Sequence, residues 1–250
     1  CMSETSLAVL HNLATQLRID SVLSTTEAGS GHPTTCLSAA EIVAALFFAE
    51  MRFDPKDPQH PEADRFVLSK GHAALALYAA LWARGWIDEE TLASYCRDDS
   101  LAGVHPDHHL PGIDFSTGSL GQGLSFGAGA ALAAKLSGSG RRVYVLISDA
   151  ECNEGSVWES VMFAAQHGLS NLVAIIDVNG QQALDHPHRV LDLSPLEARW
   201  GAFGWETHVV DGHDLAQLTT ALSLPERLNG VPPSREVSSS APRVVVARTV

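Results

Sequence analysis

Two short apolar runs, at residues 143–147 and 172–176, place the strongest constraint on the fold of this chain. Each run is typical of a buried strand, and each is followed by a side chain with a hard oxygen ligand, Asp149 after the first and Asn179 after the second. The separation of Asp149 from Asn179 matches one strand–helix–strand crossover, the connection that joins parallel strands. Because open α/β sheets bind ligands beyond the carboxyl ends of their strands, the pattern predicts a ligand site at this edge.

The oxygen atoms of Asp149 and Asn179 indicate what such a site binds. A carboxylate, an amide oxygen and a backbone carbonyl suit Mg²⁺ or Ca²⁺, and they leave coordination positions for water or diphosphate oxygens. The alternative is that both residues cap the helices that follow them, as Asp and Asn often do. The spacing by itself leaves both interpretations open.

The rest of the chain alternates apolar runs with helical patterns, which predicts an α/β fold with a parallel sheet and helices on both faces. Ser38, followed by Glu41, predicts a capping box that opens a buried helix over residues 39–49. We interpret residues 1–250 as a single domain, residues 98–119 as a long loop and the Pro/Ser-rich residues 225–242 as a mobile loop. Strands are expected at residues 66–68, 143–147, 172–177, 207–210 and 244–247, and further helices at 7–26, 73–82, 89–95, 121–136, 157–167, 195–203 and 215–222.

Composition excludes several classes of protein. The formal net charge of −13 and the absence of a basic run argue against nucleic-acid binding, which needs a basic patch. No apolar stretch in the sequence reaches the roughly 20 residues that span a bilayer, so no membrane association is expected. The four cysteines are far apart and form no CxxC pair. A cytoplasmic protein with reduced thiols is therefore the expectation.

The residues around Asp149 favour the metal interpretation. The segment SDAECNEG at residues 148–155, followed by Asn179, resembles the Mg²⁺–thiamine diphosphate motif, which is written as GDG with a later asparagine. This resemblance implies that Asp149, Asn179 and the backbone carbonyl of Gln181 hold Mg²⁺ (or Ca²⁺). The sequence departs from the motif at Ser148 and Ala150, where the family has glycines. Ala150 must therefore adopt a backbone conformation that tolerates a Cβ.

Further segments resemble the transketolase family in the family's order. They are SGHP at residues 30–33, DRFVLSKGH at 64–72, HP at 105–106 and TGSLGQG at 117–123. The resemblance implies catalytic or substrate-channel roles for His32, His72 and His105. It also implies that a second group of residues binds the cofactor: His72, Gly118, Leu120, Asp149, Ala150, Glu154 and Asn179. For Glu154 the resemblance implies, in addition, a place at a subunit interface. The structural alternatives are loop and core packing for Gly118 and Leu120, and a first-turn helix acid for Glu154.

The resemblance covers only the diphosphate-binding domain, so the chain is similar to the N-terminal subunit of split transketolases. It implies a partner, a C-terminal transketolase subunit whose pyrimidine-binding domain carries the glutamate that activates the cofactor. Two copies of each chain would form a heterotetramer that moves a two-carbon ketol unit between sugar phosphates. Two alternatives stay open: a catalytically degenerate partner-binding protein, motivated by Ser148 and Ala150, and another thiamine enzyme, against which the SGHP and SKGH segments argue.

Overall fold

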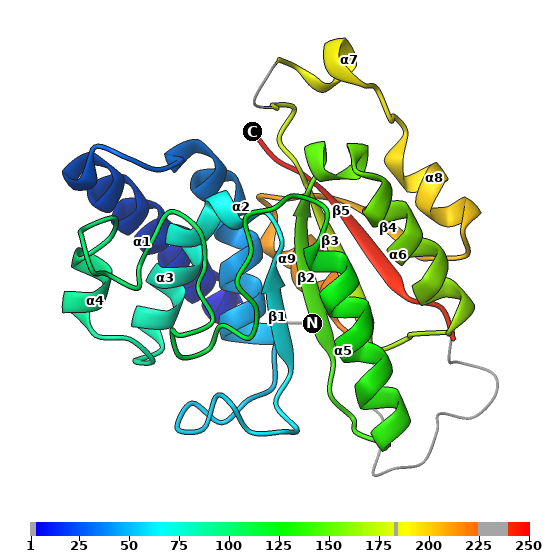
Figure 1. The fold of residues 1–250 in the computed structure, drawn as a ribbon, viewed down its shortest axis with the longest axis horizontal. Helices are drawn as coiled ribbons and strands as arrows, with labels where there is room; N and C mark the ends of the chain where they lie inside the picture. The colour runs from blue at the N-terminus through cyan, green and yellow to red at the C-terminus, as the bar shows by residue number, and fades with distance from the viewer. Residues whose placement is uncertain (1–3, 183–184, 225–239) are drawn as a thin grey trace.

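The computed structural model describes residues 4–182, 185–224 and 240–250, and within them five strands form one parallel sheet (Figure 1). The strand order is β1-β2-β3-β5-β4. All five predicted strands are present, each one or two residues longer than expected: β1 (Arg65–Leu68), β2 (Val143–Ser148), β3 (Leu172–Val178), β4 (Glu206–Asp211) and β5 (Arg243–Arg248). The α/β fold with a parallel sheet is therefore confirmed.

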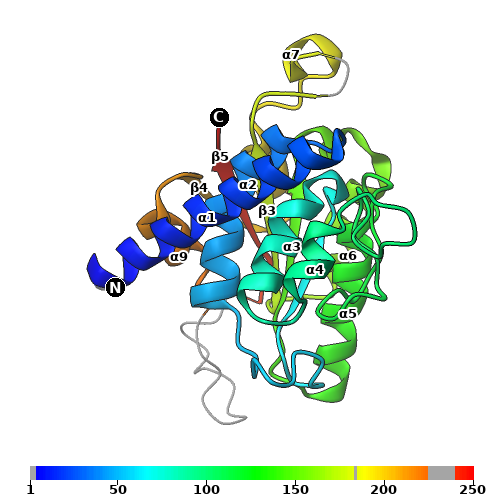
Figure 2. The ribbon, with the colours of Figure 1, turned by 90° about the vertical axis from the view of Figure 1, so that its left-hand side faces the viewer.

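Helices cover both faces of the sheet (Figure 1), and Figure 2 looks onto the group that contains the N-terminal helices. One face carries α1 (Glu4–Ala28), α2 (Pro33–Ala45), α3 (Ala74–Ala83) and α9 (Leu215–Leu222), and the other carries α5 (Gly123–Ser137), α6 (Gly155–Gln166) and α8 (Leu196–Ala202). The short elements are η1 (Leu46–Glu50), η2 (Gly71–Ala73), α4 (Glu89–Ala93), η3 (Ala150–Asn153) and α7 (Pro187–Val190), the last of which the sequence did not predict.

The central strands are covered by helices on both faces, which explains why their sequences are continuously apolar. In β2, Tyr144 and Leu146 pack in the core under α1, α2 and α3, whereas Val143, Val145 and Ile147 pack in the core under α5 and α6. Because successive side chains of a strand point to opposite faces, a strand covered on both faces needs an apolar residue at every position. The run at residues 143–147 is such a strand, so its faces are closed to a ligand and only its ends can be reached.

The predicted capping box at Ser38 and Glu41 is wrong. The helix begins at Pro33, which has a fixed backbone angle and no N–H to satisfy in the first turn. Ser38 therefore lies inside α2, where its hydroxyl donates to Asp177 Oδ2 at 2.7 Å. Glu41 is also buried in the helix and pairs with Arg18 of α1. Both polar residues serve contacts between elements and not the start of a helix.

The stretch Pro33–Glu50 is long and apolar enough to cross a bilayer, but 67% of its residues are buried inside the protein. It comprises α2 and η1, which lie between α1, α3 and the sheet. The helix is thus a core helix, as expected for residues 39–49. Residues 98–119 contain no helix or strand, as predicted. Most of the predicted mobile loop, residues 225–239, lies outside the described residues.

Candidate functional site at the strand ends

The ends of β2 and β3 bring the two predicted ligand residues to the same edge of the sheet. Ser148 is paired in register with Asp177, and the next backbone N–H, that of Asp149, donates to the Asp177 carbonyl at 3.2 Å. Asn179 follows β3 directly. The crossover through α6 thus places the Asp149 and Asn179 side chains at neighbouring strand ends.

Asp149 is buried, with 7% of its surface exposed, and its two carboxylate oxygens differ in their surroundings. Oδ1 accepts a hydrogen bond from the backbone N–H of Ala150 at 2.8 Å. Oδ2 is buried and has no hydrogen-bond partner among the residues that the structure describes. Burial, reinforced by the nearby Asp177 carboxylate, outweighs the opposing effect of the backbone N–H groups of Ala150 and Gly180 and of the Lys70 charge, and raises the pKa of Asp149 to about 6. Because a buried, unpaired carboxylate oxygen is costly, a cation at Oδ2 fits this site.

Asn179 lies in a turn that does not begin a helix. Its side-chain oxygen accepts from the backbone N–H of Gln181 at 3.1 Å, across Gly180, whose φ is +69°. The neighbouring Gln182 accepts from Asn153 of η3 at 3.3 Å, which links this turn to the segment after Asp149. The capping interpretation therefore accounts for one oxygen of Asp149, and it does not account for Asn179.

A buried ion pair lies directly behind the strand ends. Lys70, after β1, contacts Asp177 of β3, and both side chains are completely buried. The hydroxyls of Ser38 and Thr249 also donate to the Asp177 carboxylate. Burial alone would raise the pKa of Asp177, but the Lys70 ammonium and these donors hold it below its usual range. Asp177 is thus saturated by protein groups, while Asp149 keeps a free oxygen.

Neither Lys70 nor Asp177 was predicted from the sequence to be a functional residue. Lys70 lies in the segment DRFVLSKGH at residues 64–72, and Asp177 is the one charged residue in the otherwise apolar strand Leu172–Val178. A single carboxylate inside a buried strand needs a partner, because an unpaired buried charge is strongly unfavourable. A lone carboxylate in an apolar strand therefore predicts a positively charged or hydrogen-bonding partner for Asp177, but the sequence does not identify Lys70 as that partner.

We expect Lys70→Met to destabilise the protein by about 3–5 kcal/mol, because it leaves the buried Asp177 carboxylate without its counter-charge. Met keeps much of the apolar stem, so the loss of packing is small. Arg97→Met is the control, since it breaks the exposed Arg97–Glu27 pair and should cost less than about 1 kcal/mol. Urea unfolding measures both changes. An equal, small loss in the two variants would contradict the assigned importance of the pair.

Three histidines from separate segments come together beside the strand ends. His32 precedes α2, His72 lies in η2, and the rings of the two are 5.6 Å apart in an edge-to-face arrangement. His105 comes from the long loop, and its charge and that of His32 both disfavour protonation of His72. Burial, followed by the Lys70 charge, lowers the pKa of His72 to about 4. His72 is therefore neutral at pH 7, between two more exposed imidazoles.

We expect the His72 ring to stay neutral in the free protein until the pH falls to about 4. Unfolded histidine titrates near 6.5, so folding excludes a proton between these values and stability should fall as the pH drops from about 6.5 towards 4. Above that window His72 makes no pH-dependent contribution. NMR titration of the ring reports its pKa, and denaturation of His72→Gln, whose side chain does not titrate, isolates its share. A ring that titrates near 6.5 would contradict the expectation.

Gly118 lies where two segments approach too closely for a side chain. Its φ is +138°, and a Cβ there would meet the His105 ring at 2.9 Å. A Cβ on Gly71, beside His72, would meet the Gly118 nitrogen at 2.8 Å. The backbone around Gly118 therefore packs directly against the segments that carry His72 and His105. Leu120, two residues further along the chain, is 36% exposed.

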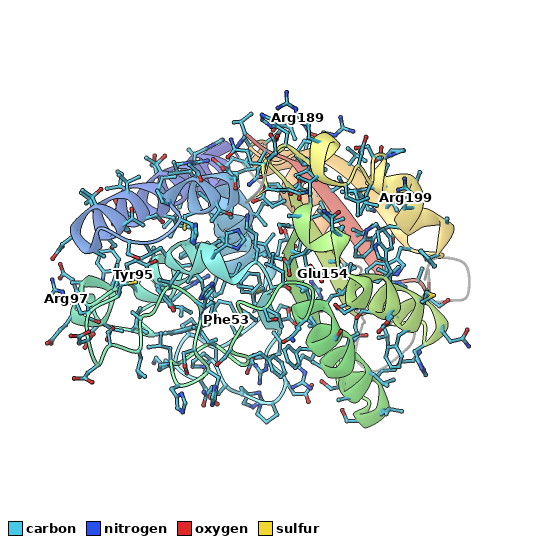
Figure 3. All side chains as sticks on the ribbon, turned by 45° about the horizontal axis from the view of Figure 1, so that its top comes forward. Phe53, Tyr95, Arg97, Glu154, Arg189 and Arg199 are labelled. Atoms are coloured by element: carbon cyan, nitrogen blue, oxygen red, sulfur yellow. The ribbon has the colours of Figure 1, made fainter. Side chains whose placement is uncertain are left out.

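Glu154 is exposed at the start of α6 (Figure 3), where it occupies the N-cap position without a side-chain capping bond. The turn before α5 packs against it, since a Cβ on Gly121 would lie 2.6 Å from the Glu154 Cβ. Glu154 and the turn at Gly121 thus border the end of β2 and form, with Asp149 and Asn179, the rim of the candidate site. Gln181 lies at the same rim, on the exposed turn after Asn179.

Comparisons with known proteins agree on one family. The family model described as "Transketolase, thiamine diphosphate binding domain" matches residues 9–233. The chain is 46% identical over 225 residues to transketolase-like protein 2 of Bos taurus, covering 89% of this chain and 36% of that protein. It is 38% identical over 234 residues to the 6-deoxy-6-sulfo-D-fructose transketolase subunit SqwG of Clostridium sp. (strain MSTE9), covering 92% of this chain and 84% of that one.

A solved structure has the same fold. The transketolase from Campylobacter jejuni superimposes with a TM-score of 0.87 at 27% identity, covering 99% of this chain and 38% of that chain. The chain therefore spans little more than a third of the length of the full-length relatives it matches, and most of the length of the relative described as a subunit.

Proposed function

We propose that this chain, which belongs to the transketolase family, supplies the diphosphate-binding half of a ketol-transfer site. The observation that carries the proposal is the free, buried Oδ2 of Asp149 at the end of β2, next to the turn that holds Asn179. A carboxylate oxygen, an amide oxygen and the carbonyl of Gln181 form a donor set suited to Mg²⁺ or Ca²⁺. A cation held there would balance the charge of thiamine diphosphate.

Thiamine diphosphate, when bound, supplies the carbanion chemistry, and the protein groups bind and orient it. Asp149, Asn179 and the Gln181 carbonyl would hold the cation, and the backbone at Gly118 and Leu120, with Ala150 and Glu154, would surround the cofactor. His72, neutral at pH 7, can donate one hydrogen bond and accept another without adding charge to the site. His32 and His105 lie nearer to solvent, where imidazoles can contact substrate hydroxyls and pass protons.

The degenerate alternative is not favoured. It rested on Ser148 and Ala150, which replace motif glycines. Ala150 lies in η3, and its backbone is not among those with positive φ, which outside glycine are only Cys96 and Asp99 in the described residues. Ser148 is the last residue of a buried strand. Neither side chain occupies a backbone conformation that requires glycine, so the substitutions do not remove the site.

We further propose that activity requires a partner chain with a pyrimidine-binding domain, in an assembly of two copies of each. Apolar side chains are exposed on the turn before α5 and on helices α5 and α6: Leu120, Phe126, Met162 and Phe163. Exposed apolar groups that gather on one surface often mark interfaces, and a closed two-fold assembly is the common arrangement. The similarity to a relative described as a transketolase subunit supports this division of the enzyme between two chains.

The proposed substrates are a ketose phosphate donor and an aldose phosphate acceptor. The relative SqwG is described as a 6-deoxy-6-sulfo-D-fructose transketolase subunit, so a ketose with a sulfonate at C6 is a second donor to test. Both donors carry an anionic group at the end remote from the ketol unit. Side-by-side assays of the assembled enzyme with the two donors would decide between them.

Calorimetry of the assembled chains with thiamine diphosphate tests the binding half of the proposal. We expect binding in the presence of Mg²⁺ and no detectable binding after the divalent cation is removed by a chelator, because the diphosphate charge is then unbalanced. Absence of binding by the assembled, Mg²⁺-loaded protein would overturn the proposal.

A further inference from the structure

The motif departure at Ser148 takes part in a contact that the proposed function does not use. The backbone N–H of Glu151 donates to the Ser148 hydroxyl at 3.2 Å, and the backbone N–H of Ser148 donates to Glu151 Oε2 at 2.9 Å. This is the reciprocal arrangement of a capping box, Ser-x-x-Glu. Asp149 and Ala150 are the two residues enclosed by it. The box therefore fixes the backbone that carries Asp149.

The other oxygen of Glu151 reaches two distant segments. Oε1 accepts from the Ser69 hydroxyl at 2.5 Å and from the backbone N–H of Gly121 at 2.9 Å. Ser69 Oγ in turn accepts from the backbone N–H of Gly123 at 3.1 Å. The carboxylate thus joins the end of β2, the segment before His72 and the turn that leads into α5.

Glu151 is suited to this role by its complete burial. None of its surface is exposed, and three donors from three segments point at its two oxygens. Hydrogen bonds to a buried carboxylate are strong, and each donor would be left unpaired if the acceptor were lost. The residue that follows it, Cys152, packs in the apolar core under α5 and α6.

We propose that Glu151, through its capping box with Ser148, is the positioning residue of the diphosphate-binding site. It holds the Gly118–Gly121 turn at a fixed place relative to Asp149. A motif glycine leaves this backbone free to adapt, whereas Ser148 fixes it with a side-chain bond. We call this set of contacts, from Glu151 to Ser148, Ser69 and Gly121, the clamp. The inference rests on the proposed function for what the site binds, but the clamp itself is a property of the protein without cofactor.

Glu151→Gln is the direct test, because it keeps the shape of the side chain but replaces one acceptor oxygen by an NH₂ group. In either orientation of the amide, that group faces a backbone N–H, of Ser148 or of Gly121. Glu41→Gln is the matched control, since Glu41 is also a buried carboxylate with hydrogen-bond partners, Arg18 and His213, away from the turn.

Amide hydrogen exchange of the cofactor-free protein is the first measurement. We expect exchange of the backbone amide that faces the new NH₂ group, that of Gly121 or of Ser148, to be at least about tenfold faster in Glu151→Gln than in Glu41→Gln, because only the former variant removes its acceptor. Ser148→Ala should accelerate exchange of Glu151 itself, and combining it with Glu151→Gln should add little, because both act on one network. If Glu151→Gln does not fold, Ser148→Ala decides the question. Unchanged exchange at these amides would overturn the clamp.

Affinity for thiamine diphosphate with saturating Mg²⁺ is the second measurement, made on the assembled chains. We expect Glu151→Gln to bind about tenfold more weakly than the original protein, whereas Glu41→Gln should bind normally despite its lower stability. If the original protein does not bind the cofactor, the proposed function fails and the exchange data still judge the clamp. If the original protein binds and Glu151→Gln binds equally well, the positioning role is refuted.

Discussion

Asp149→Ala is expected to abolish Mg²⁺-dependent binding of thiamine diphosphate while the protein stays folded. The change removes the buried Oδ2, which has no hydrogen-bond partner among the described residues and is the strongest candidate to hold the cation. Loss of a residue that only orients a metal ligand costs about 10–100-fold in affinity, so loss of a ligand itself should exceed about 100-fold. Asn179→Ala should act in the same direction, because it removes the second oxygen ligand. Calorimetry of the assembled chains gives the affinities, and circular dichroism checks the fold.

The matched control separates metal binding from helix capping. Asp88 also caps a short helix, α4, where its side chain accepts from the backbone N–H of Thr91 at 2.8 Å, far along the chain from the strand ends. Asp88→Ala should weaken the fold slightly and leave cofactor binding unchanged. If Asp149→Ala behaves like Asp88→Ala, with a small loss of stability and normal binding, Asp149 is only a cap and the metal assignment is wrong.

The purified chain alone is expected to show no ketol transfer, and activity should appear when a pyrimidine-domain partner is added. The reason is the proposed division of the site, in which the partner supplies the group that activates the cofactor. The exposed apolar residues on the turn before α5 and on α5 and α6, including Leu120 and Phe126, give the partner a surface to cover. An assay with a ketose phosphate and an aldose phosphate, run on each chain and on the mixture, measures the effect.

Contamination is the main hazard of that assay, and the chain offers its own control. The mixture made with Asp149→Ala should be as inactive as the single chain, because the partner then lacks a loaded site. Turnover by the single chain that follows this protein through every purification step, and disappears in Asp149→Ala, would defeat the two-chain proposal while supporting the metal site.

Local patterns in the sequence were sufficient to predict the fold class and the positions of the strands. The strand Val143–Ser148 is buried on both faces, so its apolar character is continuous and readable without knowledge of its neighbours. The crossover length between Asp149 and Asn179 then places them at one sheet edge, because parallel strands with a helical connection present the same ends on the same side. Local patterns were less reliable where two signals competed, as at Pro33 and Ser38, where the proline set the helix start.

The sequence by itself thus determined the parallel sheet and the two oxygen side chains, of Asp149 and Asn179, that lie at the ends of its neighbouring strands. Only the tertiary structure decided which polar groups those side chains meet. Lys70 and Asp177 are 107 residues apart, and Glu151 and Ser69 are 82 apart, yet each pair is in direct contact. Such pairings depend on how the ends of β1, β2 and β3 pack together in space. No local periodicity records that packing, so the free oxygen of Asp149 and the clamp at Glu151 became visible only in the folded chain.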